Sequence, residues 1–226
     1  MNASRPITLI DNMADNNLVG ILLASVEKWN QLRRGHSKEI MRPKLSHAKL
    51  AAAQLVGADL NGADLRGAGL SRADLCGADL NRADLREADL SGANLCVATF
   101  SEANLCEAQL SRANLMWAQL IEANLTGANL SEAHLIGAKL TGSRLNRAIL
   151  RGANFSGARL NEADLGGADL SGANLSETDL RGANLFGAKL SKTKLTGANL
   201  RGARLRKVDL IDVNLSEAQL SGADFV

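Results

Sequence analysis

Residues 58–82 read ADLNGADLRGAGLSRADLCGADLNR, a five-residue unit repeated five times. The same period extends outward in both directions, with 37 central positions from Leu45 to Phe225. Every centre is Leu except Phe100, Phe155 and Phe225. The residue two places before a centre is Ala in 31 of 36 cases. A repeat of this regularity predicts a solenoid, in which each unit packs only against its neighbours.

The five-residue period is incompatible with a long helix and with a flat strand. In a helix, successive centres would be rotated by about 500° and would scatter around the axis. In a flat strand, an odd spacing would place successive leucines on opposite faces. The chain must therefore turn once per pentapeptide to keep every Leu inside. Glycine and Asx residues, which favour turns, have suitable positions: 17 of the 21 glycines lie two residues after a centre, and Asp or Asn precedes the centre in 21 of 36 repeats.

Segments such as Ala58–Gly62 (ADLNG) and Ala173–Glu177 (ANLSE) resemble the A(D/N)LXX motif of the pentapeptide-repeat family, and the resemblance covers about four-fifths of the chain. It implies an all-β solenoid, a right-handed quadrilateral parallel β-helix with one pentapeptide per side. Residues 43–226 would then form about nine coils. At ~4.8 Å per coil the rod would be roughly 43 Å long.

Residues 1–42 form an N-terminal extension that is predicted to cap the rod. A stack of parallel coils ends in an apolar cross-section with unpaired backbone groups, which needs a cover. We expect one amphipathic helix over residues 16–34, with Asp15 or Asn16 as N-cap and Gly35 as terminator. Its apolar face would comprise Leu18, Ile21, Leu22, Ser25, Val26, Trp29 and Leu32 or Arg33.

The repeats continue to the last residues of the sequence, Ala223–Val226, without a comparable cap. We therefore expect an open C-terminal end that could pair with a second copy in a homodimer.

An apolar column is the best candidate for a functional surface. If 20 residues complete a coil, side chains one residue after every fourth centre stack on one side. This predicts a protein-contact strip of Val56, Cys76, Cys96, Met116 and Ile136, with Val97 and Trp117 beside it. Exposed contiguous apolar surface often marks a binding site. The alternative is that a column of small residues tolerates apolar members without any partner.

The three cysteines favour a reducing compartment, because an odd number does not form a disulfide framework. We therefore expect a cytoplasmic protein, with secretion less favoured. Cys76 and Cys96 would lie about 4.8 Å apart, within disulfide range, yet free thiols are expected in such a compartment. Cys106 falls on another face and no histidine completes a ligand set, so no metal or other cofactor is expected. No apolar run approaches the roughly 20 residues that span a membrane.

An enzyme is the least favoured class of function. The carboxylates before the centres are assigned to turns, and His36, His47 and His134 are scattered along the chain. The serine ladder, which comprises Ser71, Ser91, Ser111 and Ser131, is more simply read as small solvated residues.

Charge is balanced overall but not along the chain. Residues 43–135 carry 7 basic and 11 acidic residues, and residues 136–226 carry 13 and 9. The densest basic stretch, between Lys189 and Lys207, would spread around all sides as a collar, so nucleic acid is not expected as a partner. Some members of the family resemble DNA and occupy gyrase, a type II topoisomerase. Such mimicry needs an acidic surface, and these repeats are neutral and lack loops. The sequence thus predicts a non-enzymatic structural or protein-interaction module, with the gyrase modulator as alternative.

Overall fold

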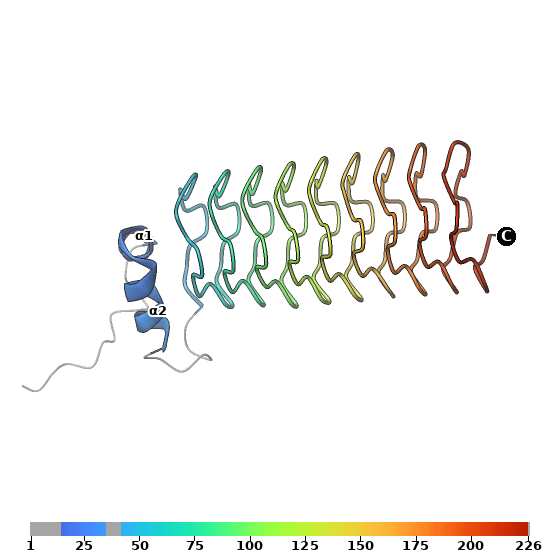
Figure 1. The fold of residues 1–226 in the computed structure, drawn as a ribbon. Coiled ribbons are helices and arrows are strands. Elements are labelled where there is room, and N and C mark those ends of the chain that lie inside the picture. The colour runs from blue at the N-terminus through green and yellow to red at the C-terminus, as the bar shows by residue number, and fades with distance from the viewer. Residues whose placement is uncertain (1–14, 35–41, 226) are drawn as a thin grey trace, which may run out of the picture.

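The computed structural model of the chain describes residues 15–34 and 42–225. Two helices, α1 (Asp15–Ala24) and α2 (Val26–Arg34), lie at the N-terminal end of a straight stack of coils (Figure 1). Parallel β-bridges join residues 20 apart, from Lys44–Asp64 to Arg204–Asp224. A bridged residue recurs at every fifth position, so four pentapeptides complete one turn.

Each coil therefore has four sides. We call them the first, second, third and fourth side, after Leu45, Leu50, Leu55 and Leu60, which are their centres in the first turn. A side comprises the residue before a centre, the centre, and the two residues after it. The fourth side of one coil leads directly into the first side of the next.

Backbone hydrogen bonds between coils repeat the same pattern along the rod. Leu60 N–H donates to Asp79 O at 2.7 Å, and Asp79 N–H donates back to Ala58 O at 3.0 Å. Gly62 N–H donates to Asn81 O at 2.8 Å. Within the pentapeptide, Ala63 N–H donates to Leu60 O at 3.0 Å and closes the turn. A coil obtains most of its backbone partners from the coils on either side, so no coil is stable alone.

The interior is filled by the repeat centres, as predicted. Every centre from Leu45 to Leu205 is at most 3% exposed, and the alanines two residues earlier are buried with them. Three non-alanine residues at that position keep their hydroxyls bonded: Ser143, Thr178 and Thr193 donate to the carbonyl oxygens of Leu140, Phe155 and Leu170. In the last turn, Leu210, Leu215 and Leu220 are only partly buried.

The turn positions also match the prediction. All 17 glycines two residues after a centre have positive φ, and 19 non-glycine residues adopt the same conformation at that position. Asx side chains hold the preceding part of the turn, as when Asp79 Oδ1 accepts from Asn81 N–H at 3.0 Å. Left-handed backbone is strained for side chains other than glycine, so the non-glycine turns store strain.

A matched pair of substitutions tests this strain. Ala52 has φ 55° and Gly157 has φ 65°, with nothing within 4 Å of a Cβ added at Gly157. We expect Ala52→Gly to stabilise the protein, and Gly157→Ala to destabilise it, each by about 1 kcal/mol. Denaturant unfolding of both variants measures the two effects, and equal shifts in one direction would contradict the account.

The N-terminal extension differs from the prediction, because one helix over residues 16–34 is wrong. Ser25 separates α1 from α2, and its Oγ accepts from Lys28 N–H at 3.2 Å, as an N-cap does. The sequence interpretation counted Ser25 as part of the apolar face and overlooked this second role. Gly35, the expected terminator, lies outside the described residues. Neither helix, nor any other in the described ranges, is long and apolar enough to cross a membrane.

Side chains of α2 cover the first coil by reproducing the bonds of a missing coil. Trp29 is fully buried and its Nε1–H donates to Asp59 O at 2.8 Å, where a leucine N–H would bond within the stack. Asn30 Oδ1 accepts from Asp59 N–H at 2.8 Å, where an alanine carbonyl would bond. Arg33 donates to Asn61 O, where the turn N–H would bond. The exposed backbone groups of Asp59 and Asn61, on the fourth side of the first coil, are thus satisfied without strand pairing.

Removal of one of these bonds should be costly. Trp29→Phe keeps an aromatic ring but leaves the partly buried Asp59 carbonyl without its indole donor, which is expected to destabilise the protein by about 1–3 kcal/mol. Trp117→Phe is the control, because Trp117 is 59% exposed. Thermal unfolding followed by circular dichroism compares them. Equal melting temperatures for the two variants would show that the indole bond does not hold the cap.

Candidate protein-contact strip

The structure brings the seven predicted contact residues together on the third side. The seven residues, which we call the apolar strip, are Val56, Cys76, Cys96, Val97, Met116, Trp117 and Ile136. Adjacent coils are linked beneath them by bonds such as Val97 N–H to Met116 O at 2.9 Å and Trp117 N–H to Ile136 O at 3.0 Å. The column therefore runs along the rod in register, one residue per coil.

Exposure is concentrated in three members of the apolar strip. Val56, Val97 and Trp117 are 52%, 50% and 59% exposed, while Cys76, Cys96, Met116 and Ile136 are half-buried. The half-buried column forms a shallow apolar base, and the three exposed side chains project from it.

Trp117 and Val97 occupy positions that favour glycine. Trp117 has φ 60° and Val97 has φ 51°, although β-branched and bulky residues are rare at positive φ. The indole lies across Gly137, where an added Cβ would collide with the ring. Both residues carry backbone strain while leaving half or more of their surface in water, so fold stability does not account for their presence.

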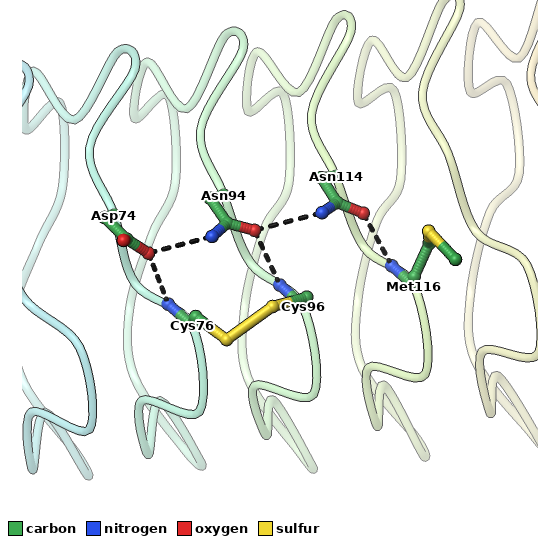
Figure 2. Close-up of a disulfide and its surroundings, with 6 residues drawn as sticks. All are labelled: Asp74, Cys76, Asn94, Cys96, Asn114 and Met116. Atoms are coloured by element: carbon green, nitrogen blue, oxygen red, sulfur yellow. Dashed lines mark hydrogen bonds between the residues drawn. A yellow bond between two sulfur atoms is a disulfide. The ribbon is translucent and has the colours of Figure 1, made fainter.

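A polar ladder borders the apolar strip and positions its backbone (Figure 2). Asn94 Nδ2 donates to Asp74 Oδ1 at 2.9 Å, and Asn114 Nδ2 donates to Asn94 Oδ1 at 3.0 Å. The same oxygens accept from the backbone N–H of Cys76 and Cys96, at 3.2 and 3.5 Å. The ladder fixes the residues that carry the strip without using its exposed surface.

The two strip cysteines are bonded, which corrects the expectation of free thiols. Cys76 and Cys96 form a disulfide with Cα atoms 4.8 Å apart, across adjacent coils (Figure 2). The coil spacing had placed them within bonding range, and the reducing compartment inferred from the odd cysteine count led to the wrong expectation. Cys106 is free on the first side, and burial raises the pKa of its thiol.

The disulfide should stabilise the rod, because it closes a loop with a sequence separation of 20 residues. By the chain-entropy model such a loop contributes about 3 kcal/mol. We expect the double variant Cys76→Ser/Cys96→Ser, or reduction of the wild type, to lower the unfolding free energy by that amount. Cys106→Ser is the control. A reduced wild type that unfolds like the oxidised protein would contradict the expectation.

Other candidate groups do not assemble into a site. His47 and His134 lie on the first and third sides in distant coils, and His36 lies outside the described residues. Ser111 Oγ donates to Ser91 Oγ at 3.4 Å, and Ser131 Oγ donates to Asn129, so these serines bond locally. Within residues 15–34 and 42–225, no three His, Cys, Asp or Glu side chains are arranged to hold a metal ion.

The sequence interpretation missed one exposed aromatic residue. Phe186 is 45% exposed on the first side, and Lys207 Nζ lies 5.2 Å from its ring centroid. Together with Asn184, Arg204 and Arg206, Phe186 lines a shallow hollow. Phe186 follows a centre directly, a position that always faces outward, so the period alone was sufficient to find it.

These features define a solenoid of five-residue repeats with one apolar surface strip. The pentapeptide repeats family model matches residues 44–82, 78–115, 113–152, 153–191 and 188–225. The chain therefore belongs to the pentapeptide repeat family, as the sequence resemblance predicted. No curated protein sequence matches the chain significantly.

Solved structures of the same family are similar. HetL, a pentapeptide repeat protein involved in heterocyst differentiation regulation from the cyanobacterium Nostoc sp. strain PCC 7120, is 35% identical with a TM-score of 0.62, covering 86% of this chain and 95% of HetL. AT2G44920 from the Arabidopsis thaliana thylakoid lumen is 38% identical over 45% of this chain and 68% of its own, with a TM-score of 0.28. QnrB1, a plasmid-mediated fluoroquinolone resistance protein, is 21% identical over 70% and 86%, with a TM-score of 0.39. Family membership and the likeness to HetL establish the right-handed β-helix.

Proposed function

We propose that this chain is a non-enzymatic interaction module that docks a protein partner on the apolar strip, along a rod of about nine coils. One observation carries the proposal: Trp117 has φ 60°, which is strained for a residue other than glycine, and yet its side chain is 59% exposed. A large, rigid and apolar residue that destabilises the free protein has the character of a binding hot spot.

The size of the apolar strip supports a central contact rather than a whole interface. Its five columnar residues span four coil steps, roughly 19 Å at ~4.8 Å per step. Stable interfaces bury about 800 Å² per partner, so the polar residues beside the strip would form the rim. The Asp74–Asn114 ladder supplies such a rim on one side, with its amides held in place.

Two substitutions at Trp117 separate binding from stability. Trp117→Gly removes the ring and relieves positive φ, so we expect equal or greater stability together with loss of the partner. Trp117→Asp adds a charge at the same point. The control, Phe186→Asp, places the same charge on another exposed aromatic, on the first side.

Quantitative pull-downs from the source cells compare the variants. A partner depleted at least about tenfold by both Trp117 changes, and retained by Phe186→Asp, supports the proposal. Identical partner profiles for wild type and Trp117→Gly would remove the apolar strip from consideration.

The other expectations stay predictions. The gyrase alternative requires an acidic surface, whereas residues 43–226 carry 20 basic and 20 acidic residues, and a supercoiling assay tests it directly. A homodimer through the last turn would cover the partly buried Leu210, Leu215 and Leu220. The cytoplasmic location loses one argument, since a disulfide is typical of oxidising compartments.

A further inference from the structure

The charge asymmetry between the two halves of the rod lies on only two of its four sides. On the first and fourth sides, residues 43–135 carry four basic and eight acidic residues, a net charge of −4. On the same sides, residues 136–225 carry nine basic and four acidic residues, a net charge of +5. The second and third sides together carry a net charge of 0 in residues 43–135 and of −1 in residues 136–225. We call the first and fourth sides, which meet at one corner, the polarised edge.

Internal ion pairs remove little of this polarity. In the acidic half, Asp64, Asp84 and Glu102 pair with Arg66, Arg86 and Arg82 at 2.7, 2.7 and 3.2 Å. Hydrogen bonds from Arg66 and Arg86 lower the pKa of the Asp64 and Asp84 carboxyls, so these pairs stay ionised. The exposed Glu87, Glu107 and Glu122 have no such partner among the described residues.

The basic half keeps a larger excess. Arg181 pairs with Asp179 at 2.7 Å and Arg206 with Asp224 at 3.3 Å. Seven further cations are exposed without a carboxylate ion-pair partner in the described part of the chain: Lys139, Arg144, Arg147, Arg159, Arg201, Arg204 and Lys207. The polarised edge thus presents unpaired acids along one half and unpaired bases along the other.

From this arrangement we infer that the polarised edge pairs with the polarised edge of a second copy in antiparallel orientation. A two-fold axis perpendicular to the rod sets the acidic half of each copy against the basic half of the other, and it sets first side on first side and fourth on fourth. Each of these two sides is polarised in the same direction by itself. The net charge changes from −1 in residues 43–135 to +3 in residues 136–225 on the first side, and from −3 to +2 on the fourth. The antiparallel arrangement is therefore complementary on both.

A second copy fits this edge better than a long polyanion does. A polyanion would be attracted to the basic half, roughly 20 Å of rod, and repelled by the acidic half beyond it. A second copy finds a complementary partner over the whole length. The edge is also distinct from the apolar strip on the third side, so the two surfaces can be tested separately.

The test measures the mass of the full chain by sedimentation velocity at low and high salt. We expect a dimer at about 20 mM salt that dissociates at about 0.5 M, because exposed charges are screened beyond a few ångströms at high ionic strength. The variant Arg201→Glu/Arg204→Glu/Lys207→Glu should weaken the dimer at least about tenfold. Its matched control, Lys189→Glu/Lys192→Glu/Lys194→Glu, reverses three exposed charges on the second and third sides of the coil that carries Arg201, and should dimerise like wild type.

A mixing experiment tests whether charge complementarity along the polarised edge makes the contact. The variant Glu87→Lys/Glu107→Lys/Glu122→Lys makes both halves of the edge basic, while the Arg201 triple variant makes both acidic. Each should be monomeric alone, and an equimolar mixture should form a mixed dimer. Circular dichroism checks that both variants are folded.

Several results would overturn the inference. The wild-type protein could remain monomeric at low salt, or it could form a dimer whose stability does not depend on salt. Its mass could also grow beyond two copies with concentration, as head-to-tail pairing would give. A monomeric wild type that binds a single-stranded DNA oligonucleotide, and loses it in the Arg201 triple variant, would assign the basic half to nucleic acid instead.

Discussion

The structure depends on one backbone constraint: every fifth residue must adopt positive φ so that the chain turns the same way. Glycine meets this constraint at 17 positions and 19 other residues accept it under strain. Because the turns recur regularly, nearly every repeat centre from Leu45 to Leu205 donates its N–H to a carbonyl 19 residues further on, and bonds such as Leu60 N–H to Asp79 O at 2.7 Å repeat along the rod. The buried leucines, the outward columns and both proposed surfaces follow from this geometry.

The regular parts of the fold were predictable because one residue type per position carries the signal. Leucine at each centre and glycine two residues later define inside and turn without tertiary information. The helical extension was less predictable, since Ser25 fits both an amphipathic face and an N-cap, and only packing against the first coil decides between them. The side-chain bonds of Trp29 and Asn30 to Asp59 could not be read from the sequence, because they depend on where the extension lies.

The candidate surfaces show the same division. The apolar strip was predictable residue by residue from a period of 20, yet its strained Trp117 and Val97 needed backbone angles. The bonded state of Cys76 and Cys96 was mispredicted, because compartment is not encoded in spacing. The polarised edge was missed for a different reason: charges were compared between halves of the sequence but were not assigned to the four sides, so the asymmetry was not located on two of them.

The way in which the coil closes also limits how such a chain can change in length. One inserted pentapeptide would rotate every later side chain onto the neighbouring side, so the Trp117 column and the charged corner would each be split at the insertion. An insertion of 20 residues would return every column to its own side. Lengthening by whole coils therefore preserves the surface columns, which any shorter addition would disrupt. A rod of this kind can change in length without changing which residues lie on each side.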